Sequence, residues 1–270
     1  MNKKSLLASP YVIWISAFIL IPLIFIVYYG ITDQTGAFTI ANLLKIIEAK
    51  NLKALWLSLL LSLVSTAICL ILAYPLAMIL SASKNGRTSL VIFVFILPMW
   101  MNGLLRTYAW QAILENNGIL NSVLRFFGLS GVSLINTPSA IIIGMIYNYL
   151  PFMILPIYNT LSKIDPDIIN ASRDLGANSL QLFGRIILPL SIPGVISGII
   201  MVFIPALTTF VISDILGGSK ILLIGNVIEQ EFKSNYNWHV GSALSLVLMV
   251  FIFICIFFTG FSDGRGENAI

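Results

Sequence analysis

The chain has 270 residues, of which 58% are hydrophobic and only 10% are charged. A soluble domain carries charge on roughly a quarter of its residues, so this composition excludes a soluble enzyme and a disordered protein. The net charge of +4 comes from single Lys and Arg residues scattered between apolar segments, which does not indicate nucleic-acid binding. Cys69 and Cys255 both lie inside apolar segments, which favours buried core residues over a disulfide or a metal site.

Six apolar segments are long enough to cross a membrane, since about 20 mostly apolar residues span the hydrocarbon core. We predict these spans at residues 11–29, 54–82, 90–114, 138–160, 186–216 and 240–261. The first follows Lys3 and Lys4 as a signal peptide would, but its apolar core is too long and no small-residue cleavage site follows. Six spans place both termini on one side, and the Lys and Arg distribution slightly favours the inner side.

The segment between the first two spans, residues 41–53, has amphipathic character. Its apolar residues fall near one helical face, with Lys45, Glu48 and Lys50 elsewhere. This pattern predicts a short helix that lies on the outer membrane surface.

Prolines interrupt several of the predicted spans. They are Pro22, Pro75, Pro98, Pro151, Pro156, Pro193 and Pro205. Each proline removes a backbone donor, and the freed carbonyl needs another partner inside the membrane. So many interruptions favour helices that bend around a pathway, as in a transporter, over a simple membrane anchor.

Polar and aromatic residues within the spans are candidates for lining such a pathway. Asp214 would be costly in the membrane unless it faces the protein interior or water, so it is either a ligand for a passing cation or an outer-interface carboxylate paired with Lys220. The aromatic candidates are Trp100, Tyr108, Trp110 and Tyr147. Their rings either face a cation in the pathway or form an interfacial belt. Arg106 is interpreted as a snorkelling or structurally paired side chain. His239 has no neighbours at metal-ligand spacing, so no metal site is expected.

The longest segment between spans on the inner side, residues 161–185, has clear helix signals. Asp165 is placed to cap a helix, and Pro166 suits its first turn. Gly176 suits a C-terminal stop with positive φ, and Asn178 or Ser179 can cap a second helix. The segment therefore predicts a helix, a glycine turn and another helix, which is the shape of a docking element.

The same segment resembles the EAA loop of permease subunits of type I ABC importers. The matching residues are Asn170-Ala171-Ser172, then Gly176, Ile186 and Leu188-Pro189 at the family spacing. The chain departs from the family pattern at two positions, with Asn170 in place of Glu and Ser172 in place of Ala. The resemblance implies that Asn170, Ala171, Ser172, Asp174 and Gly176 contact an ATPase.

A narrower resemblance covers nearly the whole chain and is to the B-type permeases of spermidine/putrescine importers. It is carried by Leu97-Pro98-Met99-Trp100-Met101-Asn102 with Arg106-Thr107-Tyr108, by Thr137-Pro138-Ser139-Ala140 with Leu150-Pro151-Phe152-Met153, and by Ser213-Asp214-Ile215-Leu216-Gly217-Gly218 with Leu223-Ile224-Gly225-Asn226. It implies polyamine transport in a bacterial cytoplasmic membrane, with the loop and both termini cytoplasmic.

The resemblance also implies an all-α permease fold with a cytoplasmic coupling helix at 165–176. Residues 1–53 would hold the first span and the outer helix, 54–262 the permease domain with its coupling loop at 161–185, and 263–270 a short cytoplasmic tail. The implied partners are a second, C-type permease, a cytoplasmic ATPase dimer and an extracytoplasmic polyamine-binding protein. The chain has no GxxxxGK[ST] phosphate loop, so we expect ATP and Mg²⁺ on the partner ATPase and no cofactor on this chain.

Other classes of protein remain as alternatives. A type I permease for thiamine, ferric iron or sulfate would share the EAA loop, and only the third-span and Asp214 motifs argue against it. A secondary transporter would be expected to show internal repeats and several membrane carboxylates. A membrane enzyme would need clustered chemical groups at one depth, and we see none in the sequence.

Overall fold

The computed structural model describes residues 10–82, 93–218 and 220–263, with side chains as far as Phe257. In this part of the chain, five helices are long and apolar enough to cross a membrane: Pro10–Ile31, Ala49–Ala82, Pro138–Leu161, Ser179–Thr208 and Trp238–Phe257. The expectation of an all-helical membrane protein is confirmed. Lys3, Lys4, the start of the third expected span at 90–92 and the tail at 264–270 lie outside the described residues.

Three long helices form the centre of the bundle: α4 (Ala49–Ala82), α8 (Pro138–Leu161) and α11 (Leu188–Thr208). Polar contacts join all three pairs. Ser65 of α4 donates to Sδ of Met145 in α8 at 3.3 Å. The hydroxyl groups of Tyr74 in α4 and Ser191 in α11 lie 2.7 Å apart, and the Tyr149 hydroxyl of α8 donates to the Pro205 carbonyl of α11 at 3.2 Å. The Pro205 carbonyl lies in the last turn of α11, where intrahelical partners run out, and a neighbouring helix supplies one.

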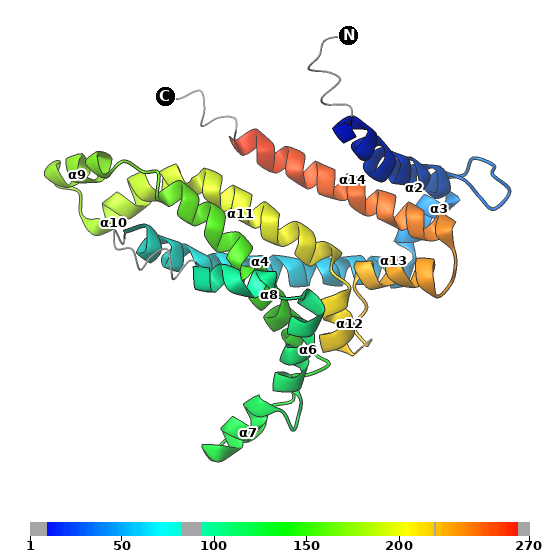
Figure 1. The fold of residues 1–270 in the computed structure, drawn as a ribbon, viewed down its shortest axis with the longest axis horizontal. Coiled ribbons are helices and arrows are strands. Elements are labelled where there is room, and N and C mark those ends of the chain that lie inside the picture. Colours follow the sequence, from blue (N-terminus) through cyan, green and yellow to red (C-terminus); the bar gives the residue numbers. More distant parts are fainter. Residues whose placement is uncertain (1–9, 83–92, 219, 264–270) are drawn as a thin grey trace, which may run out of the picture.

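A second layer pairs the two ends of the chain. Helix α2 (Ile21–Ile31), the C-terminal half of the first span, lies beside α14 (Trp238–Asp263) in Figure 1. The end of α2 meets the start of α14, where Nδ1 of His239 lies 3.1 Å from the carbonyl oxygen of Tyr29. Most of the large side chains of the first span face outward and are apolar, which suits contact with lipid.

The second span begins earlier than expected, and the predicted surface helix at 41–53 is correspondingly wrong in length. Only α3 (Ala41–Leu44) and one 3₁₀ turn (Lys45–Ile47) precede the span. The chain turns once at Glu48, where ψ is 137°. Asn51 then donates to the Lys45 carbonyl at 2.8 Å, so residues 49–53 continue directly into α4.

The third predicted span is not one continuous helix. A 3₁₀ turn at Leu97–Trp100 ends at Met101, where ψ is 147°, and α6 (Gly103–Leu114) starts afresh. Asn102 caps this new helix by accepting a hydrogen bond from the backbone of Leu104 at 2.8 Å. At about 1.5 Å per residue, α6 is too short to cross a bilayer by itself. Helix α7 (Ile119–Phe126) follows and projects away from the bundle (Figure 1).

The fifth predicted span, 186–216, is wrong at both ends. The helical segment begins at Ser179 with α10 (Ser179–Leu182), passes through a π-helical turn (Phe183–Ile187) and ends with α11 at Thr208. Thr209 is extended, and α12 (Val211–Gly217) forms a separate short helix. Asp214 therefore lies beyond the break and not at the end of a continuous span.

Candidate functional site

Contacts from α13 (Ile224–Lys233) fix the break between α11 and α12. The Asn226 side chain donates to the Phe210 carbonyl at 3.0 Å and accepts hydrogen bonds from the Ser213 hydroxyl and the Leu223 backbone. A Cβ at Gly225 would lie 2.7 Å from the Thr208 carbonyl oxygen, so glycine is needed for this close approach. Two sequence motifs, one around Asp214 and one at 223–226, thus form a single structural unit.

This unit places the Asp214 carboxylate at the wall of a polar cavity. The cavity has a volume of about 250 Å³ and is lined by Asp214, Asn226, Glu229, Gln230, Lys233 and Ser234. Asp214 itself is exposed. Glu229 forms an ion pair with Lys233 at 2.6 Å, one turn along α13. The cavity therefore brings two carboxylates and one ammonium group to the end of the bundle where α13 lies.

The four predicted aromatic residues separate into two groups. Trp110 of α6 and Tyr147 of α8 meet edge to face, with ring centroids 5.2 Å apart. Trp100 is 79% exposed and instead contacts Phe93, with centroids 6.3 Å apart. Tyr108 is also exposed. Because α12 packs against both α6 and α8, the helix of Asp214 and the Trp110–Tyr147 pair belong to one neighbourhood.

Arg106 of α6 is not ion-paired to any described residue. Its Nε and Nη1 atoms are hidden from solvent and have no hydrogen-bond partner. The prediction of a snorkelling side chain fits these buried atoms poorly.

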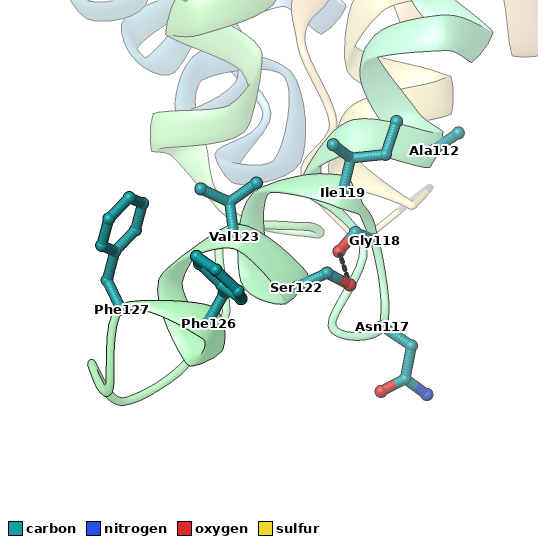
Figure 2. Close-up of a pocket in the computed structure, with 8 residues that line it drawn as sticks. All are labelled: Ala112, Asn117, Gly118, Ile119, Ser122, Val123, Phe126 and Phe127. Carbon is teal, nitrogen blue, oxygen red and sulfur yellow. Dashed lines mark hydrogen bonds between the residues drawn. The ribbon is translucent and has the colours of Figure 1, made fainter.

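Another cavity lies beside α7 and holds none of the predicted site residues. It has a volume of about 640 Å³, and its wall includes Ile119, Val123, Phe126 and Phe127. Figure 2 shows Ile119, Val123 and Phe127 pointing to one side of α7 while Asn117 points to the other. The lining carries no charged side chain, which distinguishes this cavity from the one at Asp214.

The predicted docking element forms as its helix signals indicate. Helix α9 (Pro166–Asp174) begins at Asp165, whose side chain accepts from the Asp167 backbone at 2.9 Å. Gly176 follows its C-terminal end, and the φ of +83° at this glycine confirms the expected left-handed turn. Ala177 donates to the Ser172 carbonyl and Gly176 to the Arg173 carbonyl, the pair of bonds that closes a Schellman motif. Asn178, rather than Ser179, caps α10.

The five predicted coupling residues are not equivalent in this loop. Asn170, Ala171, Asp174 and Gly176 are exposed, whereas Ser172 is buried and donates to the Ile168 carbonyl at 2.6 Å. Leu175 is 88% exposed at the tip of the loop, although its apolar character suggests burial. The loop lies at the opposite end of the bundle from α3 and α13 (Figure 1).

Of the residues that line the Asp214 cavity, sequence reasoning assigned a role only to Asp214. Glu229 and Lys233 of α13 were not singled out. Asn226 stood inside a recognised motif but carried no assigned role. The four-residue spacing of Glu229 and Lys233 on one helix was the available signal, because side chains four apart face each other.

Comparison with known proteins identifies the family. The family model described as "Binding-protein-dependent transport system inner membrane component" matches residues 5–263. The spermidine/putrescine transport system permease protein PotB of Haemophilus influenzae is 39% identical over 252 residues, which cover 90% of this chain and 88% of that protein. PotB of Escherichia coli is 37% identical over 245 residues, covering 88% of this chain and 89% of that protein.

Solved structures show the same fold. A chain of a bacterial alginate ABC transporter superposes with a TM-score of 0.82 at 17% identity, covering 97% of this chain and 93% of that chain. A chain of the MetNI methionine ABC transporter gives a TM-score of 0.57 at 19% identity, covering 81% of this chain and 94% of that chain. The protein is an ABC importer permease subunit and not itself an enzyme, and it belongs to the family of inner membrane components of binding-protein-dependent transport systems.

Proposed function

We propose that this chain is the B-type permease of an ATP-driven polyamine importer and forms the transmembrane pathway for spermidine and putrescine together with a second, C-type permease. The observation that carries the proposal is the 39% identity to a spermidine/putrescine permease across 90% of the chain. The Asp214 cavity supports it, because carboxylates suit a substrate that carries ammonium groups.

The proposed topology has six crossings with both termini in the cytoplasm. Five are the long helices, and the third is the interrupted segment that the structure describes from residue 93 to 114. In this orientation α9 and α10 face the cytoplasm, while α3 and α13 face outward. Interrupted helices at a pathway are familiar in transporters, since non-helical backbone is tolerated where it lines a cavity.

The proposed pathway starts at the Asp214 cavity and continues along the Trp110–Tyr147 pair. Asp214 and Glu229 attract an ammonium group at the outer side. The faces of Trp110 and Tyr147 then accept it through cation–π contacts, with Trp100 and Tyr108 as further aromatic surfaces. Several ammonium groups need more negative charge than this chain offers, so the second permease supplies part of the site.

The proposed coupling runs through α9. An ATPase dimer, which holds ATP and Mg²⁺, contacts the exposed residues Asn170, Ala171, Asp174 and Gly176. Ser172 is buried and stabilises the helix through its hydrogen bond to the Ile168 carbonyl. Closure of the ATPase moves α9, which is joined to α11 through α10. The spans then shift between inward and outward access, a change in population between two packings.

The test is uptake of labelled spermidine in cells that express this chain with its ATPase, second permease and binding protein, each omitted in turn. Unlabelled putrescine, thiamine, ferric iron and sulfate serve as competitors. The proposal requires that uptake depend on this chain, the ATPase, the second permease and the binding protein, and that only polyamines compete with it. Uptake that yields to another solute would assign a different type I permease. Uptake by this chain alone would indicate a secondary transporter.

A further inference from the structure

We propose that a hollow at the outer ends of α2 and α14, called here the Tyr236 pocket, binds a protonated alkylamine. The pocket has a volume of about 400 Å³ and is lined by Tyr29, Gln34, Tyr236, Asn237, Trp238 and His239. It lies at the end of the bundle opposite α9 (Figure 1). None of its residues belongs to the Asp214 cavity or to the Trp110–Tyr147 pair.

The pocket offers aromatic faces on several sides. Tyr236 and Trp238 are exposed, and the Tyr29 and His239 rings meet edge to face with centroids 5.3 Å apart. The Trp238 ring packs edge to face against the Phe232 ring, with centroids 5.5 Å apart. Aromatic faces attract an ammonium group electrostatically, and Trp and Tyr are better partners for it than Phe.

The backbone holds Tyr236 in an unusual conformation. Its φ is +49°, in the left-handed region that a bulky residue rarely adopts. Hydrogen bonds on both sides maintain it, because Asn235 donates to the Gln230 carbonyl at 3.0 Å and Asn237 to the Glu231 carbonyl at 2.8 Å. Asn or Gly would fit this turn at lower cost, and strain of this kind clusters at ligand sites.

His239 contributes a hydrogen-bond acceptor. Its Nδ1 lies 3.1 Å from the Tyr29 carbonyl oxygen, which can only accept, so Nδ1 carries the hydrogen. In the neutral imidazole, Nε2 is then left with a free lone pair. A protonated amine has the N–H donors that this lone pair requires.

A negative charge, Asp33, stands one residue before Gln34 of the pocket lining. Oδ1 of Asp33 accepts hydrogen bonds from the Thr35 hydroxyl at 2.6 Å, the Thr35 backbone at 2.8 Å and the Ala37 backbone at 2.9 Å. The bond from the Thr35 hydroxyl, followed by that from Ala37, lowers the pKa of the Asp33 carboxyl. Aromatic faces, an acceptor and a nearby carboxylate together fit an ammonium group on an apolar stem.

The inference that the pocket binds an alkylamine is drawn from these contacts. The identity of the natural amine depends on the proposed function. One source is a free polyamine that gathers at the outer surface before entry. The other is a lysine side chain of the extracytoplasmic binding protein. Both present the same alkylammonium group, so the experiment has one arm for each.

The test measures equilibrium binding of labelled n-butylamine to the purified importer complex in lipid nanodiscs, without binding protein. Asp33→Asn removes the charge but keeps the Oδ1 acceptor, and Tyr236→Asn removes the ring but suits the positive φ. Tyr236→Asn should weaken binding about threefold, the scale of an exposed cation–π contact. Asp33→Asn should weaken it by a similar factor, about that of an exposed ion pair. The measurements are repeated with Asp214→Asn, so that binding at the Asp214 cavity is separated from binding at the pocket. Butylamine binding does not require polyamine transport, so failure of the proposed function would leave this result intact.

The control is Trp56→Leu, which removes an exposed ring of α4 that does not line the pocket. Unchanged butylamine binding in both pocket variants overturns the proposal. Equal loss in Trp56→Leu also overturns it, because exposed rings would then bind the amine without a pocket. The second arm compares spermidine uptake with the affinity for binding protein. A raised KM for spermidine with unchanged binding-protein affinity identifies the free polyamine, whereas weaker binding-protein affinity identifies its lysine.

Discussion

Trp110 of α6 and Tyr147 of α8 meet edge to face, with ring centroids 5.2 Å apart. The contact joins the interrupted third segment to one of the central helices of the bundle. Trp110 also packs against the apolar cluster around Leu216, on the helix that carries Asp214. The pair is thus the structural link between the aromatic and the carboxylate parts of the proposed pathway.

We expect the two rings to act as a unit in transport. Replacing either Trp110 or Tyr147 by Leu should lower spermidine uptake, and the double variant should lose less than the sum of the single effects. A ring pair of this kind contributes about 0.5–1.5 kcal/mol beyond its burial. A double-mutant cycle on the uptake rate measures this coupling. Trp100→Leu with Tyr147→Leu is the control and should be additive, and coupling there of equal size would contradict the distinct role of the pair.

Asp214→Asn should lower spermidine uptake about tenfold, since a hydrogen bond to a charged group contributes about 1.5–3 kcal/mol. The isosteric amide leaves the packing of α12 unchanged, so assembly of the complex should persist. Uptake and the yield of purified complex are measured together. Glu231→Gln is the matched control, because Glu231 lies on α13 but does not line the cavity. Unchanged uptake in Asp214→Asn would remove this carboxylate from the pathway.

Gly176→Val should uncouple ATP hydrolysis from transport. The left-handed φ of +83° strains a β-branched residue by roughly 1–2 kcal/mol, so the α9 turn would reorganise. No other atom lies within 4 Å of a Cβ at this position, so the effect is conformational and not a clash. The measurement is the ratio of ATP hydrolysed to spermidine taken up. Gly176→Asn tolerates the turn and should retain coupling, whereas normal transport by Gly176→Val would refute the role of the turn.

Gly225→Ala should destabilise the protein by about 1–3 kcal/mol, the usual cost of overpacking. The added methyl group would lie 2.7 Å from the Thr208 carbonyl oxygen and 2.8 Å from that of Thr209. Thermal unfolding of the purified complex measures the loss. Gly184→Ala is the control, since a Cβ there meets nothing within 4 Å, and its Tm should stay the same or rise. An unchanged Tm in Gly225→Ala would show that α13 can move away from the break.

The coupling loop was predictable because its signals are local. Asp165, Pro166 and Gly176 act within one or two turns of the residues that they cap or stop, and each behaves in the structure as its type predicts. The exposure of Leu175 was not predictable, because the surface that covers an apolar residue can belong to another molecule.

The helix break in the fifth segment shows the opposite case. Hydropathy continues through Thr209, so a pattern of apolar residues extends across this break. The break depends on Asn226 and Gly225, which approach from α13 some 16 residues later in the chain. No local signal carries that information.

The sequence by itself determined an all-helical membrane protein, the position of most spans and the capped shape of the coupling loop. These follow from hydrophobic length and from hydrogen bonds between near neighbours, which composition and spacing encode directly. Only the tertiary structure decided where the fifth span breaks, that Glu229 joins Asp214 in one cavity, and that Trp110 meets Tyr147 while Trp100 lies apart. Each of these depends on contacts between helices that are distant in sequence. Such contacts form only when the helices pack against one another in the folded bundle.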